Sequence, residues 1–138
     1  MLFFWCFLLG VLAQPSPWLQ AALAQKNGHR RVLLLYADTR ANPHLLAQTT
    51  ALAAGRVAMA ERDLDVLIVC EPALSGPDRT YLHKKMGLQR APPAFAGWLI
   101  GKDGGLKKRL TRPIAPVRLF GLIDAMPMRQ AERCSQRP

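Results

Sequence analysis

Two stretches of the sequence carry residues that could do chemistry. Cys70 ends the apolar run LDVLIVC and would be a reactive thiol if a nearby positive charge, such as that of Arg40 or His44, lowered its pKa. The second stretch, YADTRANPH at 36–44, joins an apolar run to the start of a predicted helix and contains no cysteine. Disulfide exchange is therefore excluded there, whereas Thr39, Arg40 and His44 could bind a carboxylate or sulfate near the helix start.

Both stretches also have a simpler structural interpretation. Cys70 follows Leu67, Ile68 and Val69, so it fits a buried and inert core cysteine equally well. Asn42 stands just before a proline, where it would cap the helix and leave its neighbours in solvent. If Cys70 is reactive, Cys134 is the thiol available as its resolving partner.

A group of basic residues covers a predicted hairpin and the turn after it: Lys102, Lys107, Lys108, Arg109 and Arg112. Together with a net charge of +10, the group favours an anionic partner, which could be an anionic polymer, a lipid headgroup or an acidic protein. Its affinity would fall with added salt. The alternative is that lysines on an edge strand prevent aggregation between sheets.

Several site classes are excluded by spacing. The three histidines form no metal-binding spacing with a cysteine or carboxylate pair, so no metal site is predicted. GWLIGKD lacks both the glycine spacing and the hydroxyl residue of a phosphate loop. We therefore expect no cofactor.

The N-terminus resembles a secretion signal. The first 25 residues carry no charged side chain, and Ala22 and Ala24 have the small-x-small spacing of a signal peptidase site. We expect cleavage after Ala24, a periplasmic or secreted protein, and no specific nucleic-acid partner. Alternatively, residues 2–24 stay as a membrane anchor, because they could span a bilayer; membrane contact is expected only in that case.

Apolar periodicity and turn residues define the elements that must position these side chains. A linker at 25–30 is followed by a strand at 31–37, a helix at 43–62 and a strand at 64–70 that is buried on both faces. Next come a short helix, capped by Ser75 with Asp78 and ended by Gly87, and hairpin strands at 95–101 and 106–111. The last expected helix begins near Pro116 and is stopped by Pro127, and a polar tail follows at 130–138.

This order, βαβαββα, predicts an α/β fold with a mixed sheet and flanking helices, the arrangement of a single thioredoxin-like domain at 31–129. A right-handed helical crossover would make the first two strands parallel. The junction at 36–44 would then lie at the carboxyl end of the first strand, beside Cys70.

Two runs carry a family resemblance: WLIGKDGGLKKRL at 98–110 and LFGLIDAMPMRQAE at 119–132. They resemble domain of unknown function 4174, a family of small exported bacterial proteins related to a domain of animal extracellular-matrix proteins. The resemblance implies a thioredoxin- or peroxiredoxin-like fold without an established reaction. Pro92 and Pro93 stand where thioredoxin-like proteins place a cis-proline, although a trans bond is also compatible with the sequence.

Together these features favour an exported thioredoxin-like domain without a CxxC motif, acting as a non-catalytic binding module. The alternative is a single-cysteine thiol peroxidase or oxidoreductase that uses Cys70.

Overall fold

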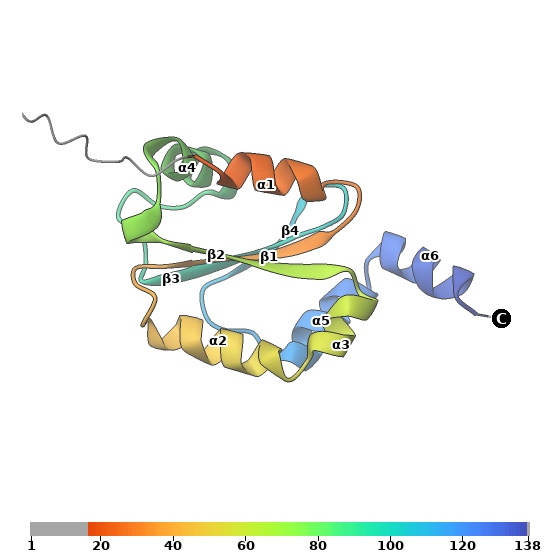
Figure 1. Cartoon of the computed structure of the whole chain (residues 1–138). Helices are drawn as coiled ribbons and strands as arrows, with labels where there is room; N and C mark the ends of the chain where they lie inside the picture. The colour runs from red at the N-terminus through yellow and green to blue at the C-terminus, as the bar shows by residue number, and fades with distance from the viewer. Residues whose placement is uncertain (1–16, 138) are drawn as a thin grey trace, which may run out of the picture.

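The computed structural model describes residues 17–137 and shows a four-stranded mixed sheet between two layers of helices (Figure 1). This is the predicted fold class. In chain order the elements are α1 (Leu19–Lys26), β1 (Arg31–Ala37), α2 (Pro43–Ala53), α3 (Arg56–Glu61), β2 (Leu64–Cys70), η1 (Glu71–Ala73), α4 (Gly76–Tyr81), η2 (Leu82–Met86), β3 (Phe95–Ile100), β4 (Leu106–Leu110), α5 (Pro116–Asp124) and α6 (Pro127–Ser135).

The sheet has the order β2-β1-β3-β4, with β1 in its interior. β2 runs parallel to β1, so that Arg31 lies opposite Leu64 and Ala37 opposite Cys70. β3 runs antiparallel to β1, and β4 antiparallel to β3. All seven residues of β1 are buried, as expected for a strand covered on both faces.

Alternate side chains of β1 enter two separate cores. Leu34 and Tyr36 pack on the face covered by α1 and α4, together with Trp98 of β3. Leu33 and Leu35 pack on the opposite face, which α2, α3 and α5 cover. Because side chains alternate across a strand, one short apolar run supplies both cores.

The helix predicted for 43–62 is interrupted. α2 ends at Ala53, and α3 begins at Arg56 after Gly55. A Cβ at Gly55 would lie 3.2 Å from the Phe120 ring of α5, so the missing side chain leaves room for that ring. The break falls at Gly55, whose low helix propensity is a local signal that the apolar periodicity does not register.

β2 is less buried than the sequence predicts. Its apolar run favours a strand covered on both faces, but β2 forms an edge of the sheet, and Ile68 is 40% exposed. Strand order, which the local sequence does not encode, explains the difference.

The second predicted helix has the expected cap and end. The Ser75 hydroxyl accepts the N–H of Asp78 at 3.1 Å, and the π-helical turn η2 is followed by Gly87 at φ +71°. The Asp78 carboxylate does not bond to the start of its own helix, as a capping box would require. It accepts the backbone N–H groups of Trp18 and Leu19 at 3.2 and 3.1 Å and so caps α1.

The C-terminal segment differs from the expected polar tail, because α6 extends to Ser135. Pro127 does follow the end of α5, as predicted, but it also opens the next helix, where a proline at the first position costs no hydrogen bond. The side chains of Arg129 and Glu132 join α6 to the rest of the domain.

The expected cleavage point after Ala24 lies inside α1. Leu19 is fully buried in the core beneath this helix, and Leu23 packs against it. Most of the expected signal segment, residues 1–16, lies outside the described residues, so cleavage after Ala24 stays a prediction. Within residues 17–137, no helix has the length and apolar character needed to cross a membrane.

A truncation series tests the role of α1. We expect a chain that begins at Gln25 to have a free energy of unfolding about 3 kcal/mol lower than one that begins at Pro17, because Leu19 and Leu23 lose their apolar contacts. Urea unfolding followed by circular dichroism measures the difference. Equal midpoints would show that α1 is dispensable and that cleavage after Ala24 leaves the fold intact.

Candidate functional site

The start of α2 is already capped from within the chain. The Asn42 side-chain oxygen accepts the N–H groups of His44 and Leu45 at 2.9 and 3.2 Å. Its amide nitrogen donates to Asp38 and to the Ala94 carbonyl at 2.9 and 3.1 Å, and the residue is only 5% exposed. The helix N–H groups that could have held an anion or a thiolate are therefore occupied by an amide.

The predicted anion-binding residues around this cap do not converge on one point. Thr39, Arg40 and His44 are all exposed. The Thr39 N–H bonds to the neighbouring Asp38 carboxylate, and the His44 ring packs at 5.8 Å from that of Phe95. Among the described residues, Arg40 forms no ion pair. Within the described residues, the side chains of these three residues share no hydrogen-bond or ion-pair partner.

Cys70 lies on the α2 side of the sheet, at the end of β2 and opposite Ala37. It is 6% exposed and belongs to the apolar core that includes Leu45 and Phe95. It is thus near the start of α2, as predicted, but its surroundings are hydrophobic. This is the environment of a core cysteine.

Cys134 lies at the other end of the sheet. Two residues before it, the Glu132 carboxylate contacts Arg31 at the start of β1. In the sheet, Arg31 lies opposite Leu64, the first residue of β2, and Cys70 is the last residue of that strand. At about 3.3 Å per strand residue the two cysteines are separated by roughly 20 Å, far beyond the reach of a disulfide. Both thiols are free. Within one folded chain Cys134 is therefore too distant to resolve an oxidised Cys70.

Tyr36 begins the polar junction in the sequence, yet it faces away from α2. Its hydroxyl donates to Glu71 at 2.6 Å on the α4 face, and Arg79 pairs with the same carboxylate at 2.6 Å. Burial, together with the Glu71 carboxylate, raises the pKa of Tyr36. Burial opposes ionisation of Glu71, but the bonds from Tyr36 and Arg79 outweigh it and lower the pKa of Glu71.

Two cations of the predicted hairpin cluster have acidic partners. Lys102 is 11% exposed and pairs with Asp63 and Glu132 at 2.8 and 2.6 Å. Burial opposes its charge, but the two carboxylates outweigh this effect and raise the pKa of Lys102. Lys107 pairs with Asp103 in the hairpin turn at 2.8 Å. Neither is a free surface charge.

The remaining cations of the hairpin lie on two faces. In the register of β3 and β4, Lys108 lies opposite Leu99, so its side chain is on the α5 side of the sheet. Arg109 lies opposite Trp98, so its side chain is on the α4 side. Arg112, just beyond β4, is exposed. None of these three forms an ion pair within the described part of the chain. The sequence cluster is therefore not one continuous patch.

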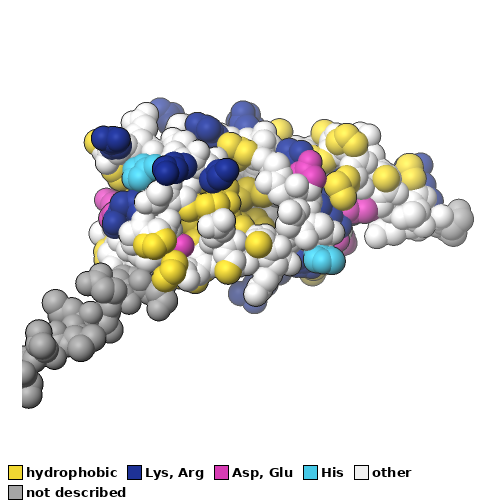
Figure 2. Space-filling model, turned by 90° about the horizontal axis from the view of Figure 1, so that it is seen from above, with side chains coloured by type: hydrophobic (Ala, Val, Ile, Leu, Met, Phe, Trp, Pro, Cys, Tyr) yellow, Lys and Arg dark blue, Asp and Glu magenta, His cyan; other side chains and the backbone are white. Residues whose placement is uncertain are grey.

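Tertiary structure creates a different basic surface. A Cβ on Gly87 would lie 2.7 Å from the Arg109 guanidinium, so Arg109 lies against the residue that follows η2, the helical turn that carries Lys84 and Lys85. We call Lys84, Lys85 and Arg109 the helix–hairpin patch. Figure 2 shows Lys and Arg side chains gathered on this face of the molecule. Only folding brings the end of η2 beside Arg109 of β4.

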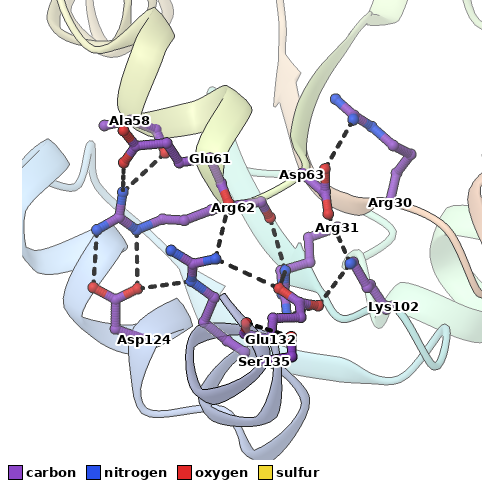
Figure 3. A network of polar contacts seen from close by, with 11 residues as sticks. Arg30, Arg31, Ala58, Glu61, Arg62, Asp63, Lys102, Asp124, Glu132 and Ser135 are labelled. Carbon is purple, nitrogen blue, oxygen red and sulfur yellow. Dashed lines mark hydrogen bonds and ion pairs between the residues drawn. The ribbon is translucent and has the colours of Figure 1, made fainter. Parts of the chain in front are cut away.

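A second group missed by sequence reasoning is an ion-pair network at the start of β1 (Figure 3). Glu132 contacts Lys102 at 2.6 Å, Arg31 at 3.1 Å and Arg129 at 3.6 Å. Burial opposes ionisation of Glu132, but Lys102 and Arg31 outweigh it and lower its pKa. The participants come from β1, the hairpin turn and α6, so no local motif indicates them.

Within residues 17–137, no three His, Cys, Asp or Glu side chains are grouped closely enough to hold a metal ion. The same part of the chain has no cis peptide bond, so Pro92 and Pro93 are both trans.

The arrangement of sheet and helices is a thioredoxin-like fold of the kind that peroxiredoxins also have. A reduced 2-Cys peroxiredoxin of Plasmodium vivax aligns with a TM-score of 0.58 and 19% identity, over 80% of this chain and 84% of the other. Thioredoxin peroxidase I of Plasmodium yoelii gives 0.56 and 18%, over 84% and 82%. A cysteine-to-serine mutant of peroxiredoxin 6 from Arenicola marina gives 0.50 and 13%, over 83% and 66%. At these identities the likeness shows the fold alone.

Residues 22–132 match the family described as "Domain of unknown function (DUF4174)", and the chain belongs to this family. The resemblance seen in the two sequence runs is confirmed. No curated protein matches the sequence.

Substitutions at the α2 start separate structural residues from free ones. We expect Asn42→Ala to lower the free energy of unfolding by about 2 kcal/mol, because the helix cap and the bonds to Asp38 and Ala94 are lost. Arg40→Ala, at an exposed position, is expected to change it by less than about 0.5 kcal/mol. Urea unfolding measures both, and equal effects would contradict the assignment of Asn42 as the cap.

Proposed function

We propose that this protein is an exported, non-catalytic binding module that holds an anionic polymer of the cell envelope on its helix–hairpin patch. The thioredoxin-like fold supplies a rigid sheet on which η2 and β4 present their cations together. Export in this proposal means a periplasmic or secreted location after removal of the N-terminal segment.

The observation that carries the non-catalytic part is the capped start of α2. An amide oxygen of Asn42 takes the helix N–H groups at the position where thiol chemistry would need a thiolate. The one cysteine near that position, Cys70, is buried among apolar side chains. Neither feature supplies an accessible and activated nucleophile.

The positive charge of the chain and of the helix–hairpin patch supports the proposal of an anionic ligand. The chain has a net charge of +10, and none of the three patch cations forms an ion pair with the described residues. The patch draws its cations from a helix end and a strand, which suits an extended, multiply charged ligand better than a small one. Such binding depends on electrostatic attraction and weakens as salt screens it.

The patch is tested by a triple variant, Lys84→Gln with Lys85→Gln and Arg109→Gln. Its matched control is Arg56→Gln with Arg118→Gln and Arg133→Gln, which removes the same charge from exposed positions on α3, α5 and α6. On immobilised heparin we expect the patch variant to bind about tenfold more weakly than the wild type and to elute at lower salt. The control is expected to lose much less.

Equal losses from the two triple variants would show that net charge alone drives binding, and the patch would have no special role. Vesicles rich in phosphatidylglycerol provide a second probe. Binding of the vesicles without binding of heparin would replace the polymer by a lipid surface.

A second function is favoured by one observation: the fold is shared with peroxiredoxins, and Cys70 lies beside the start of α2. In this alternative the protein is a thiol peroxidase or oxidoreductase with Cys70 as its single reactive cysteine. The distance to Cys134 requires any resolving thiol to come from another molecule.

Alkylation kinetics decide between the two functions. In a Cys134→Ser background we expect Cys70 to react with iodoacetamide at least about 100-fold more slowly in the folded protein than in urea, because its sulfur is buried. Fast labelling of the folded protein well below the ordinary thiol pKa of about 8.5 would reveal a stabilised thiolate. Peroxide consumption that is abolished by Cys70→Ser would then establish the enzyme.

A further inference from the structure

A cavity of about 210 Å³ lies between the hairpin turn and the start of α6. Met126, Pro127 and Met128 form an apolar side of the cavity, and Arg31, Lys102 and Lys107 also line it. The cavity is at the end of the sheet where β1 begins, and the helix–hairpin patch contributes no residue to it.

Two residues of the cavity wall, Arg31 and Lys102, belong to an ion-pair network with more positive than negative side chains. Six cations (Lys26, Arg30, Arg31, Arg62, Lys102 and Arg129) share five carboxylates (Glu61, Asp63, Asp65, Asp124 and Glu132) in one connected set of ion pairs. One positive charge is left without a matching carboxylate. Asp103, which also lines the cavity, is already paired with Lys107.

Arg31 shows the same shortage of acceptors at the level of single atoms. Its side chain is 1% exposed, and its two terminal nitrogens bond to Glu132 and to the Arg62 carbonyl. Its Nε has no hydrogen-bond partner, which is unusual for a buried polar group. Figure 3 shows Arg31 and Lys102 converging on the single Glu132 carboxylate.

We propose that this cavity binds a small aliphatic carboxylate. The carboxylate group approaches Arg31, Lys102 and Lys107, whose charges are already shared with Glu132, Asp63 and Asp103, and supplies a further acceptor beside Arg31, whose Nε has none. The hydrocarbon chain packs against Met126 and Met128. Charge and hydrophobic contact together select an amphiphilic anion over an inorganic ion or a neutral molecule of the same shape.

The test is a titration of the full-length protein with sodium hexanoate, with hexanamide as the neutral analogue and acetate as the analogue with only a methyl group. In protein labelled with ¹³C at the methionine methyl groups, we expect hexanoate to shift the signals of Met126 and Met128 and to leave Met59 and Met86 unchanged. Hexanamide and acetate are expected to bind at least about tenfold more weakly.

Two adjacent lysines supply a matched pair of variants. Lys107→Gln removes a charge from the cavity wall and is expected to weaken hexanoate binding about tenfold. Lys108→Gln removes the same charge one residue along β4, outside the cavity, and is expected to change the affinity less than twofold. Lys107 is 37% exposed, so this substitution leaves the core intact.

The proposal is overturned if hexanoate shifts no methionine signal, if hexanamide binds as well as hexanoate, or if the two lysine variants have equal effects. A peptide that ends in leucine, compared with its C-terminally amidated form, identifies the source of the carboxylate. Binding of hexanoate but not of the peptide indicates a free acid, and binding of both indicates that a chain terminus also fits.

Discussion

The rest of the structure depends on the burial of β1 on both faces. A run of seven residues without a solvent-facing side requires a helix layer above and below it, because each face would otherwise expose leucines to water. α1 and α4 cover one side, and α2, α3 and α5 cover the other (Figure 1). Leu33 and Leu34, adjacent in the sequence, therefore belong to different cores.

The same constraint extends to the first residue of the strand. Arg31 starts β1, so its guanidinium is drawn into the interior, where a charge without partners is costly. Glu132 of α6 and the Arg62 carbonyl meet it there. The contact with Glu132 joins α6 to the start of β1, and Lys102 of the hairpin turn pairs with the same carboxylate.

The two ends of the sheet differ in how fully their buried polar groups are hydrogen-bonded. At the carboxyl ends of β1 and β2, Asn42 caps the N-terminus of α2. On the opposite face of the sheet, the Tyr36 hydroxyl donates a hydrogen bond to Glu71. The polar groups at this end of the sheet thus bond to partners within the chain. At the opposite end the ion pairs do not use every donor, and a cavity with an apolar side adjoins them.

Local sequence patterns were enough to predict the strands at 31–37 and 64–70, the hairpin, and the caps at Asn42 and Ser75, because each depends on residues close together in the chain. Apolar periodicity alone did not place the break at Gly55, where the Phe120 ring lies close to the backbone. The exposure of β2 and the separation of Lys108 from Arg109 follow from strand order and pairing. The helix–hairpin patch and the Arg31 network likewise required the folded chain, because side-chain charges act through space, and their distances are set only when distant segments pack together.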